Sequence, residues 1–248
     1  MIEIRNLSKS YGLFTALKNI DLRLDQGLTH VFLGSSGSGK STLLKMISGL
    51  EKPDNGSLVI SGKNQIESSQ KKISSEIGYV LQDACLFPHL NCLQNIILPA
   101  KISKWSSDKI SNRVHELREI MQLPEKLLTK YPQELSGGQR QRIALMRSLL
   151  LNPPIILLDE PLGALDPIVR ADLQKDLKQV FNLLNKTVII VTHDINEAAF
   201  FGHTISLFHE GQLIQHGNFE SFMKNPANEF VTRFMNAQKP SAELLNYL

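Results

Sequence analysis

The sequence predicts an α/β fold in which helices cover both faces of a largely parallel sheet, with a helical subdomain inserted into that core. Three observations predict this fold. Short, continuously apolar segments rich in Val, Ile and Leu are spaced along the chain. Amphipathic helical patterns lie between them. A glycine-rich segment also connects one apolar strand to the start of a helix.

Composition and charge narrow the class of protein. The 248 residues are 42% hydrophobic and 21% charged, which is typical of one globular unit with a full core. The net charge of +3 is spread along the chain, so we expect no nucleic-acid partner. Cys85 and Cys92 are too few for a disulfide framework and lack metal-ligand spacing. No apolar run approaches the roughly 18 residues that span a bilayer, and the first residues lack an export signal, so we expect a cytosolic location.

The strands of the core are expected where β-branched and apolar residues run between glycine, asparagine or charged residues. Continuous rather than alternating apolar runs are typical of strands buried on both faces. The predicted strands are His30–Leu33, Leu58–Ile60, Ile77–Leu81, Ile155–Leu158, Thr187–Thr192 and Thr204–Phe208.

Helices are expected where apolar residues recur every three or four positions, as they do in two series: Ile110, Val114, Leu117, Met121 and Leu173, Leu177, Val180, Leu184. Residues 90–151 show this periodicity with no convincing strand, and prolines flank the stretch at 88 and 153–154. We therefore predict a helical subdomain over 88–151, inserted between core segments 1–87 and 152–218. One further helix is expected over about 219–234, followed by a C-terminal tail over 237–248.

A phosphate-binding loop is the sharpest local motif. The residues that match G-x-x-x-x-G-K-[ST] and its helix start are Gly34, Ser35, Ser36, Gly37, Ser38, Gly39, Lys40, Ser41 and Thr42. Glycines let backbone N–H groups converge on phosphate oxygens, and the helix N-terminus adds the positive end of its dipole. Lys40 would reach the β- and γ-phosphates, and the Ser41 hydroxyl would ligate Mg²⁺. The alternative, a glycine–serine loop without function, is expected by chance in about one chain in a hundred.

Two acidic residues end a second apolar strand. Asp159 and Glu160 follow the run at 155–158, at the carboxyl edge where open α/β sheets bind ligands. Asp159 would hold Mg²⁺, and Glu160 would orient and deprotonate the attacking water as a general base. Alone, the pair could equally be solvated acids that cap a strand. Beside a phosphate loop, the functional interpretation is favoured.

A third motif, Leu135–Gln139, lies inside the helical insertion. Ser136 could be an ordinary N-cap, but a helix N-terminus with small residues is also an anion site. The sequence Leu-Ser-Gly-Gly-Gln resembles the signature of ATP-binding cassette (ABC) ATPases. The other positions that resemble this family, in its order, are Tyr11 for adenine stacking, Gln82 of the Q-loop, Asp166 of the D-loop segment 163–166, and the switch histidine His193.

The resemblance covers residues 1–236 and implies a P-loop NTPase cassette with a RecA-like core, an N-terminal antiparallel β region and the helical insertion. It implies that ATP and Mg²⁺ are the cofactors. Gln82 would sense Mg²⁺ and water, His193 would contact the γ-phosphate, and Ser136, Gly137, Gly138 and Gln139 would bind ATP held by a second copy. The implied partners are a second ATPase subunit, integral-membrane permease subunits on whose cytoplasmic face the chain lies, and indirectly a substrate-binding protein.

Several stretches are similar to the ATPases of osmoprotectant importers, which suggests glycine betaine or choline as the solute. They are Gly78–Gln82 with Leu86–His89, Lys104–Trp105, Tyr131–Pro132, Leu165–Arg170 and Asn225–Val231. Two features depart from that group: Leu162 stands where Phe is frequent, and the sequence stops at Leu248 without paired regulatory domains. The alternatives are an importer ATPase for another small polar solute, such as an amino acid or a sulfonate, and a non-transport ABC ATPase.

Overall fold

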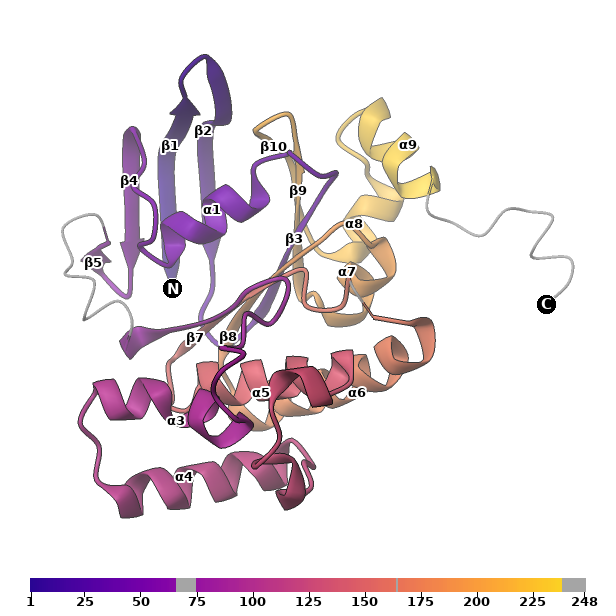
Figure 1. Ribbon diagram of the computed structural model, residues 1–248. Coiled ribbons are helices and arrows are strands. Elements are labelled where there is room, and N and C mark those ends of the chain that lie inside the picture. The colour runs from indigo at the N-terminus through magenta and orange to yellow at the C-terminus, as the bar shows by residue number, and fades with distance from the viewer. Residues whose placement is uncertain (66–74, 164, 238–248) are drawn as a thin grey trace, which may run out of the picture.

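The computed structural model describes residues 1–65, 75–163 and 165–237. Two sheets and a group of helices make up this part of the chain (Figure 1). Ala164 of the expected D-loop lies outside the described residues, and so does the expected tail apart from Ala237.

The main sheet has six strands in the order β10-β9-β3-β8-β7-β6. Strands β9 to β6 run parallel, and β10 pairs antiparallel with β9. Every residue of β3, β7 and β8 is buried, so helices cover both faces, as continuous apolar runs predict. The expected α/β class with its parallel sheet is confirmed. The strands are β3 (Thr29–Leu33), β6 (Ile77–Val80), β7 (Ile155–Asp159), β8 (Thr187–Thr192), β9 (Thr204–His209) and β10 (Gln212–Gly217).

A smaller antiparallel sheet, in the order β2-β1-β4-β5, forms the N-terminal region. Its strands are β1 (Ile2–Tyr11), β2 (Phe14–Leu24), β4 (Asn55–Ile60) and β5 (Lys63–Asn64). Helix α1 (Lys40–Ile47) shares one apolar core with this sheet and with β3, β7 and β8. The phosphate loop therefore enters a helix that is packed between the two sheets.

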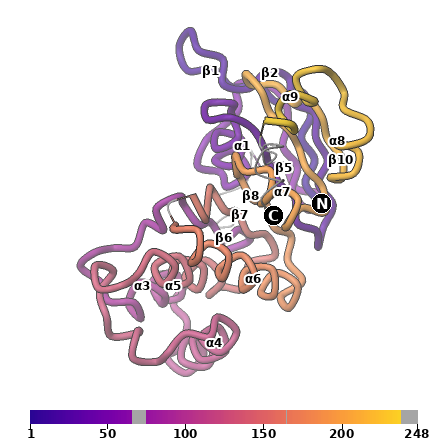
Figure 2. Tube along the Cα trace, turned by 90° about the vertical axis from the view of Figure 1, so that its right-hand side faces the viewer, coloured from indigo at the N-terminus to yellow at the C-terminus, as the bar shows by residue number. Residues whose placement is uncertain are grey.

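The helical subdomain lies at the end of the molecule opposite β1 and β2, as Figures 1 and 2 both show. It contains α3 (Cys92–Ile102), α4 (Ser107–Ile120), two 3₁₀ turns (Glu125–Leu127 and Pro132–Glu134) and α5 (Gly137–Leu149). The apolar series of α4 and of α6 (Pro167–Leu184) both pack into the larger core cluster, as their periodicity predicts. Helix α7 (Ile195–Phe201) packs against β3 and β8.

One expected helix is two. The segment predicted as a single helix over 219–234 forms α8 (Phe219–Lys224) and α9 (Glu229–Ala237). Pro226 explains the break, since a residue that precedes proline avoids helical geometry, and Asn225 adopts φ −135° and ψ 63°. The Gln215 side chain bridges the gap by accepting from the Ala227 N–H at 2.8 Å. No helix in the described part of the chain has the length and hydropathy that crossing a bilayer requires.

Candidate functional site: a phosphate loop and the ends of three parallel strands

The phosphate loop connects β3 to α1 in a conformation that only glycine tolerates. Gly39 has φ 98°, and a Cβ atom there would lie 2.4 Å from the Ala16 carbonyl oxygen. A Cβ atom at Gly34 would lie 2.3 Å from the Phe208 carbonyl oxygen. By contrast, a Cβ atom at Gly37 would meet nothing within 4 Å, so this part of the loop is open.

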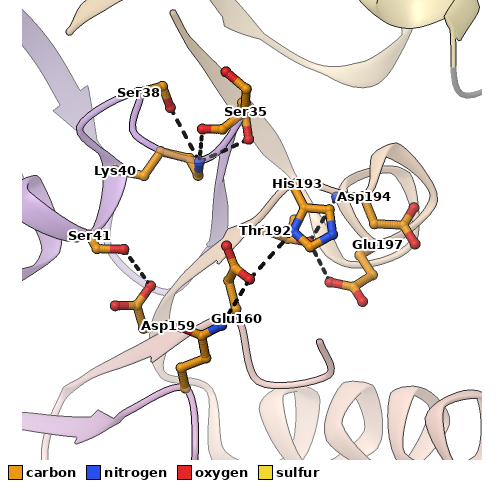
Figure 3. A network of polar contacts seen from close by, with 12 residues as sticks. Ser35, Ser38, Lys40, Ser41, Asp159, Glu160, Thr192, His193, Asp194 and Glu197 are labelled. Atoms are coloured by element: carbon orange, nitrogen blue, oxygen red, sulfur yellow. Dashed lines mark hydrogen bonds and ion pairs between the residues drawn. The ribbon is translucent and has the colours of Figure 1, made fainter. Parts of the chain in front are cut away.

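Lys40, the first residue of α1, is only 4% exposed and folds back over the loop. Its Nζ donates to the carbonyl oxygens of Gly34 at 2.8 Å and Ser35 at 2.7 Å, and to Ser38 Oγ at 3.2 Å (Figure 3). Burial lowers the pKa of this ammonium, while the nearby Glu160 and Asp159 carboxylates act in the opposite direction. The loop therefore holds a buried positive charge at the N-terminus of a helix, which suits phosphate oxygens.

Asp159 ends β7 beside the phosphate loop. Its Oδ1 accepts from Ser41 Oγ at 2.9 Å, and its Oδ2 accepts from the Tyr79 hydroxyl at 3.4 Å. Burial raises the pKa of Asp159, and the two hydroxyl donors oppose that effect. Sequence analysis did not single out Tyr79; its only signal is its place on β6, paired in register with Leu157, two residues before Asp159.

Glu160 follows directly and adopts a left-handed backbone with φ 44°, and its N–H donates to the Val191 carbonyl oxygen at 3.0 Å. Its Oε2 lies 3.3 Å from Gln82 Nε2 and 3.4 Å from His193 Nδ1. Gln82 follows β6, Glu160 follows β7 and His193 follows β8. The structure thus brings together the three residues expected to be catalytic, at the ends of three adjacent parallel strands. Figure 3 shows Glu160 and His193 side by side.

The turn that carries His193 is fixed by a buried pair that sequence analysis missed. Thr192 Oγ1 donates to Glu197 Oε2 at 2.6 Å and accepts from the Asp194 N–H at 3.0 Å. Glu197 is buried, and this burial raises the pKa of its carboxyl group. From sequence alone, a glutamate on a helix is expected to be exposed to solvent. The packing of α7 against β8 buries this one.

A cavity of about 310 Å³ lies over the phosphate loop. Tyr11 does not line it and is 47% exposed; partial burial raises the pKa of its hydroxyl, and the charge of the nearby Glu51 adds to this effect. The aromatic residue at the cavity is Phe14, which pairs with Tyr11 across the β1–β2 hairpin and which sequence analysis missed. The lining residues are Phe14, Ala16, Ser36, Gly37, Ser38, Gly39, Lys40, Ser41, Thr42, Gln82 and Glu160.

The signature residues lie elsewhere in the same chain. Ser136 caps α5: its Oγ accepts from the Gln139 N–H at 3.3 Å, and Gln139 Oε1 accepts from the Ser136 N–H at 3.0 Å. Cβ atoms at Gly137 and Gly138 would lie 2.7 and 2.8 Å from side-chain atoms of the 165–169 segment, so the first turn of α5 packs directly on that segment. Asp166 in turn caps α6 by accepting from the Val169 N–H at 3.0 Å.

None of the residues 136–139 lines the cavity over the phosphate loop. Gly137 instead lines a separate cavity of about 210 Å³, which also contacts Gln82 and Pro161. One chain therefore does not bring the signature residues and the phosphate loop into one pocket.

The donor set fits a nucleotide and a hard cation. Ser41, Asp159 and Gln82 offer hydroxyl, carboxylate and amide oxygens, the ligand types that Mg²⁺ takes. Within the described residues, no group of three or more His, Cys, Asp or Glu side chains could hold a metal by itself. This is consistent with a cation that takes its other ligands from water and a bound phosphate, as Mg²⁺ usually does.

Comparison with known proteins assigns the family. The ABC transporter family model matches residues 17–163, more than half of the chain. The chain belongs to the ABC transporter family and has the fold of its ATPase cassettes, as the signature motif predicted.

Two curated relatives share similar identity but differ in length. The glycine betaine/carnitine/choline transport ATP-binding protein OpuCA of Bacillus subtilis is 42% identical over 96% of this chain, which spans 63% of that relative. The probable sulfate/thiosulfate import ATP-binding protein CysA of Chlorella vulgaris is 43% identical over 94% of this chain, which spans 98% of that relative. A dimeric structure of the ATP-binding cassette MJ0796, bound to ADP and Pi, superposes with a TM-score of 0.78 at 35% identity, covering 88% of this chain and 98% of the other.

Proposed function

We propose that this chain is the ATP-hydrolysing subunit of an ABC importer, and that two copies close around two ATP molecules. One observation carries the proposal: Lys40, Ser41 and Glu160 line a cavity of about 310 Å³ at the carboxyl edge of the parallel sheet, and Asp159 accepts a hydrogen bond from Ser41. The family match and the ADP- and Pi-bound neighbour support a nucleotide there.

In this proposal the chain contributes positioning and charge more than covalent chemistry. Lys40 and the backbone N–H groups of the phosphate loop neutralise the phosphate oxygens. Ser41, Asp159 and Gln82 would hold Mg²⁺, which when bound neutralises charge that develops on the transferring phosphoryl group.

Glu160 acts as the general base and takes a proton from the attacking water. Its carboxylate is oriented by Gln82 and His193, whose nitrogens lie within 3.4 Å of Oε2. His193 would also contact the γ-phosphate.

The second half of each ATP site would come from the other chain. The N-terminus of α5, with Ser136 as its cap, is an anion-binding arrangement that does not line the phosphate-loop cavity of the same chain. A γ-phosphate held between Lys40 of one copy and Ser136 of the other would hold the dimer closed, and hydrolysis would release it. The dimeric neighbour supports this arrangement.

The mechanical output would go to integral-membrane permease subunits, with the chain peripheral on the cytoplasmic face of the membrane and a substrate-binding protein as an indirect partner. We propose a quaternary-ammonium osmoprotectant, glycine betaine or choline, as the solute. The name of the Bacillus relative and the resemblance at 165–170 and 225–231 support this choice.

A second candidate is a small anionic solute such as sulfate or a sulfonate. The 43% identity to the Chlorella protein over nearly its whole length favours it. The ATPase site itself does not distinguish these solutes, because the solute does not bind there.

Uptake by a deletion strain separates the two candidates. In a strain without redundant transporters, deletion should abolish uptake of labelled betaine or choline at high osmolarity and leave sulfate uptake unchanged. The isolated chain should show no betaine binding by calorimetry, because recognition of a quaternary ammonium group needs an aromatic cage. The single tryptophan of the chain, Trp105, packs against the core, and Lys109 Nζ lies 3.8 Å from its ring centroid. Normal betaine and choline uptake with loss of sulfate uptake would establish the second candidate instead.

A further inference from the structure

The loop that follows Gln82 has an unusual backbone. Ala84 and Cys85 are consecutive, neither is glycine, and both adopt positive φ angles of 59° and 43°. Left-handed geometry is unfavourable for residues with a Cβ atom and persists only where the surroundings enforce it. We therefore asked which contacts hold these two residues.

Arg147, in the last turn of α5, holds both of them. Its Nη1 donates to the Cys85 carbonyl oxygen and its Nη2 to the Ala84 carbonyl oxygen, each at 2.9 Å. The guanidinium carbon also lies 6.0 Å from the centroid of the Phe87 ring. A planar guanidinium presents two parallel donors in a fixed geometry, which the point charge of a lysine does not.

A second clamp holds the rest of the loop. Asn95 on α3 is fully buried; its Oδ1 accepts from the Phe87 N–H at 2.8 Å, and its Nδ2 donates to the carbonyl oxygens of Phe87 and Leu90. Both clamps belong to helices of the helical subdomain, so residues 84–90 are fastened to that subdomain.

The start of the loop faces the catalytic centre instead. Gln82 follows β6 of the core, and its Nε2 donates to Glu160 Oε2 at 3.3 Å. Helix α5, about 20 Å long for its 13 residues, carries Ser136 at one end and Arg147 at the other. A single helix thus connects the signature motif to the loop that holds Gln82.

We propose that Arg147 is a positioning residue for ATP hydrolysis: it ties the left-handed pair Ala84–Cys85 to α5, so that Gln82 beside Glu160 follows the position of the signature helix. This inference rests on the proposed function, because Gln82 and Glu160 are catalytic only if the chain hydrolyses ATP. When α5 moves toward a phosphate, the carbonyls held by Arg147 move with it, and Gln82 is two residues away.

Kinetics test the role of Arg147. Arg147→Met should lower kcat about tenfold or more while the affinity for ATP changes less than about twofold, because misplacing a catalytic group by about 1 Å can cost up to a hundredfold in rate. Arg142→Met is the matched control, since Arg142 lies on the same helix but pairs with Asp176 on α6. Its kcat should stay within about twofold of wild type. Arg147→Lys should restore little, because lysine lacks the planar pair of parallel donors with which Arg147 holds the two carbonyl oxygens.

A second-site change separates positioning from stability. Replacing both Ala84 and Cys85 with glycine in the Arg147→Met background removes the penalty for left-handed geometry, so part of kcat should return. A lowered melting temperature with unchanged kcat, or no recovery with the glycine pair, would overturn the positioning role.

Hydrogen exchange tests the clamp without any activity. The N–H groups of Ala84 and Phe87 are bonded in the native loop, to Leu81 O and Asn95 Oδ1. Arg147→Met should speed exchange in the 82–90 peptide and leave α5 protected. If exchange there is unchanged while the wild type hydrolyses ATP, the inference fails and the proposed function stands; a wild type that does not hydrolyse ATP overturns the proposed function itself.

Discussion

The phosphate loop and the signature motif each lead into the N-terminus of a helix, yet their surroundings differ. Around the phosphate loop, polar contacts connect the site residues to one another. Lys40 donates to the loop carbonyls, and Ser41 donates to Asp159. Glu160 lies within 3.4 Å of a nitrogen of Gln82 and of His193. Ser136, by contrast, bonds within its own helix among the residues that the structure describes, through the capping pair with Gln139. The first site gathers its charges within one chain, whereas none of the residues 136–139 lines the phosphate-loop cavity of that chain.

The difference shows how the two motifs divide the work. A buried lysine and two strand-end carboxylates are costly to desolvate, so they persist where opposite charges and hydrogen bonds are arranged together. A serine-capped helix start is inexpensive and can remain exposed until an anion arrives. We therefore propose that the chemistry takes place at the strand ends and that the signature recognises ATP held by a second copy.

The largest effect is expected at Glu160. Glu160→Gln keeps the size of the side chain and its contacts with Gln82 but removes the base, so turnover should fall about a thousandfold while ATP binding is retained. ATP should then trap a closed dimer, measurable by sedimentation alongside steady-state hydrolysis. Turnover near the wild-type rate would show that another group is the base.

A smaller effect, on binding rather than chemistry, is expected at Lys40. Lys40→Ala removes a buried ammonium that faces the phosphate position, so ATP affinity should fall about ten- to a hundredfold, the worth of one or two charge-assisted hydrogen bonds. Titration with a fluorescent nucleotide measures it. Unchanged affinity would contradict the role of the loop, and Lys45→Ala, on the same helix, is a suitable control.

Tyr79 should matter less. Tyr79→Phe removes one hydroxyl donor at 3.4 Å from Asp159 and leaves the Ser41 bond in place. A single hydrogen bond as long as 3.4 Å predicts about a threefold fall in kcat. The Tyr79 hydroxyl favours the ionised form of the Asp159 carboxylate. Its removal should therefore raise the Mg²⁺ concentration that half-maximal activity requires. A fall as large as that for Asp159→Asn would mean that Tyr79 touches the reacting groups.

Acid should weaken the sheet that carries the phosphate loop. His30 is buried in β3, between the Thr204 hydroxyl and the Asp25 carbonyl oxygen, and burial lowers its pKa, with His216 and His203 adding to the effect. A lowered folded-state pKa means that the unfolded chain binds the proton first. Stability is therefore present above the unfolded value of about 6.5 and is lost as the pH falls below it. Urea unfolding should show that the free energy of unfolding falls more between pH 7.5 and pH 5.5 for the wild type than for His30→Gln. An equal fall in both proteins would contradict this.

Much of the core was predictable from sequence, because the strands of the parallel sheet are continuously apolar and the sequence motifs follow directly after these strands. The ends of β3, β7 and β8 follow from runs such as 155–158 and 187–192. The N-terminal strands β1 and β2 were not predicted from their residues, because they are exposed on one face and carry polar residues at irregular intervals and register shifts. Only the family resemblance implied an antiparallel region there.

The partners of the site residues were less predictable than the residues themselves. Asn95 and Glu197 bond residues within eight positions of themselves but are buried by the packing of their helices, and no local pattern marks them. Tyr79 contacts Asp159, which lies 80 positions away. The two hydrogen bonds from Arg147 to the carbonyl oxygens of Ala84 and Cys85 were equally unpredictable, since these partners lie 63 and 62 positions away. Pro226 was a local signal for a helix break, and the prediction of one helix over 219–234 did not take it into account.

The most direct test of the split site is to mix defective subunits. If Ser136 acts on the phosphate held by the other chain, a dimer of one Ser136→Arg and one Lys40→Ala subunit has one intact site and one doubly damaged site. The mixture should then hydrolyse ATP faster than either variant alone. In the reciprocal mixture, an excess of the Lys40→Ala, Ser136→Arg double variant should suppress wild-type activity, because every site in the mixed dimer loses one half. No gain in the first mixture together with undiminished wild-type activity in the second would show that each chain completes its own site.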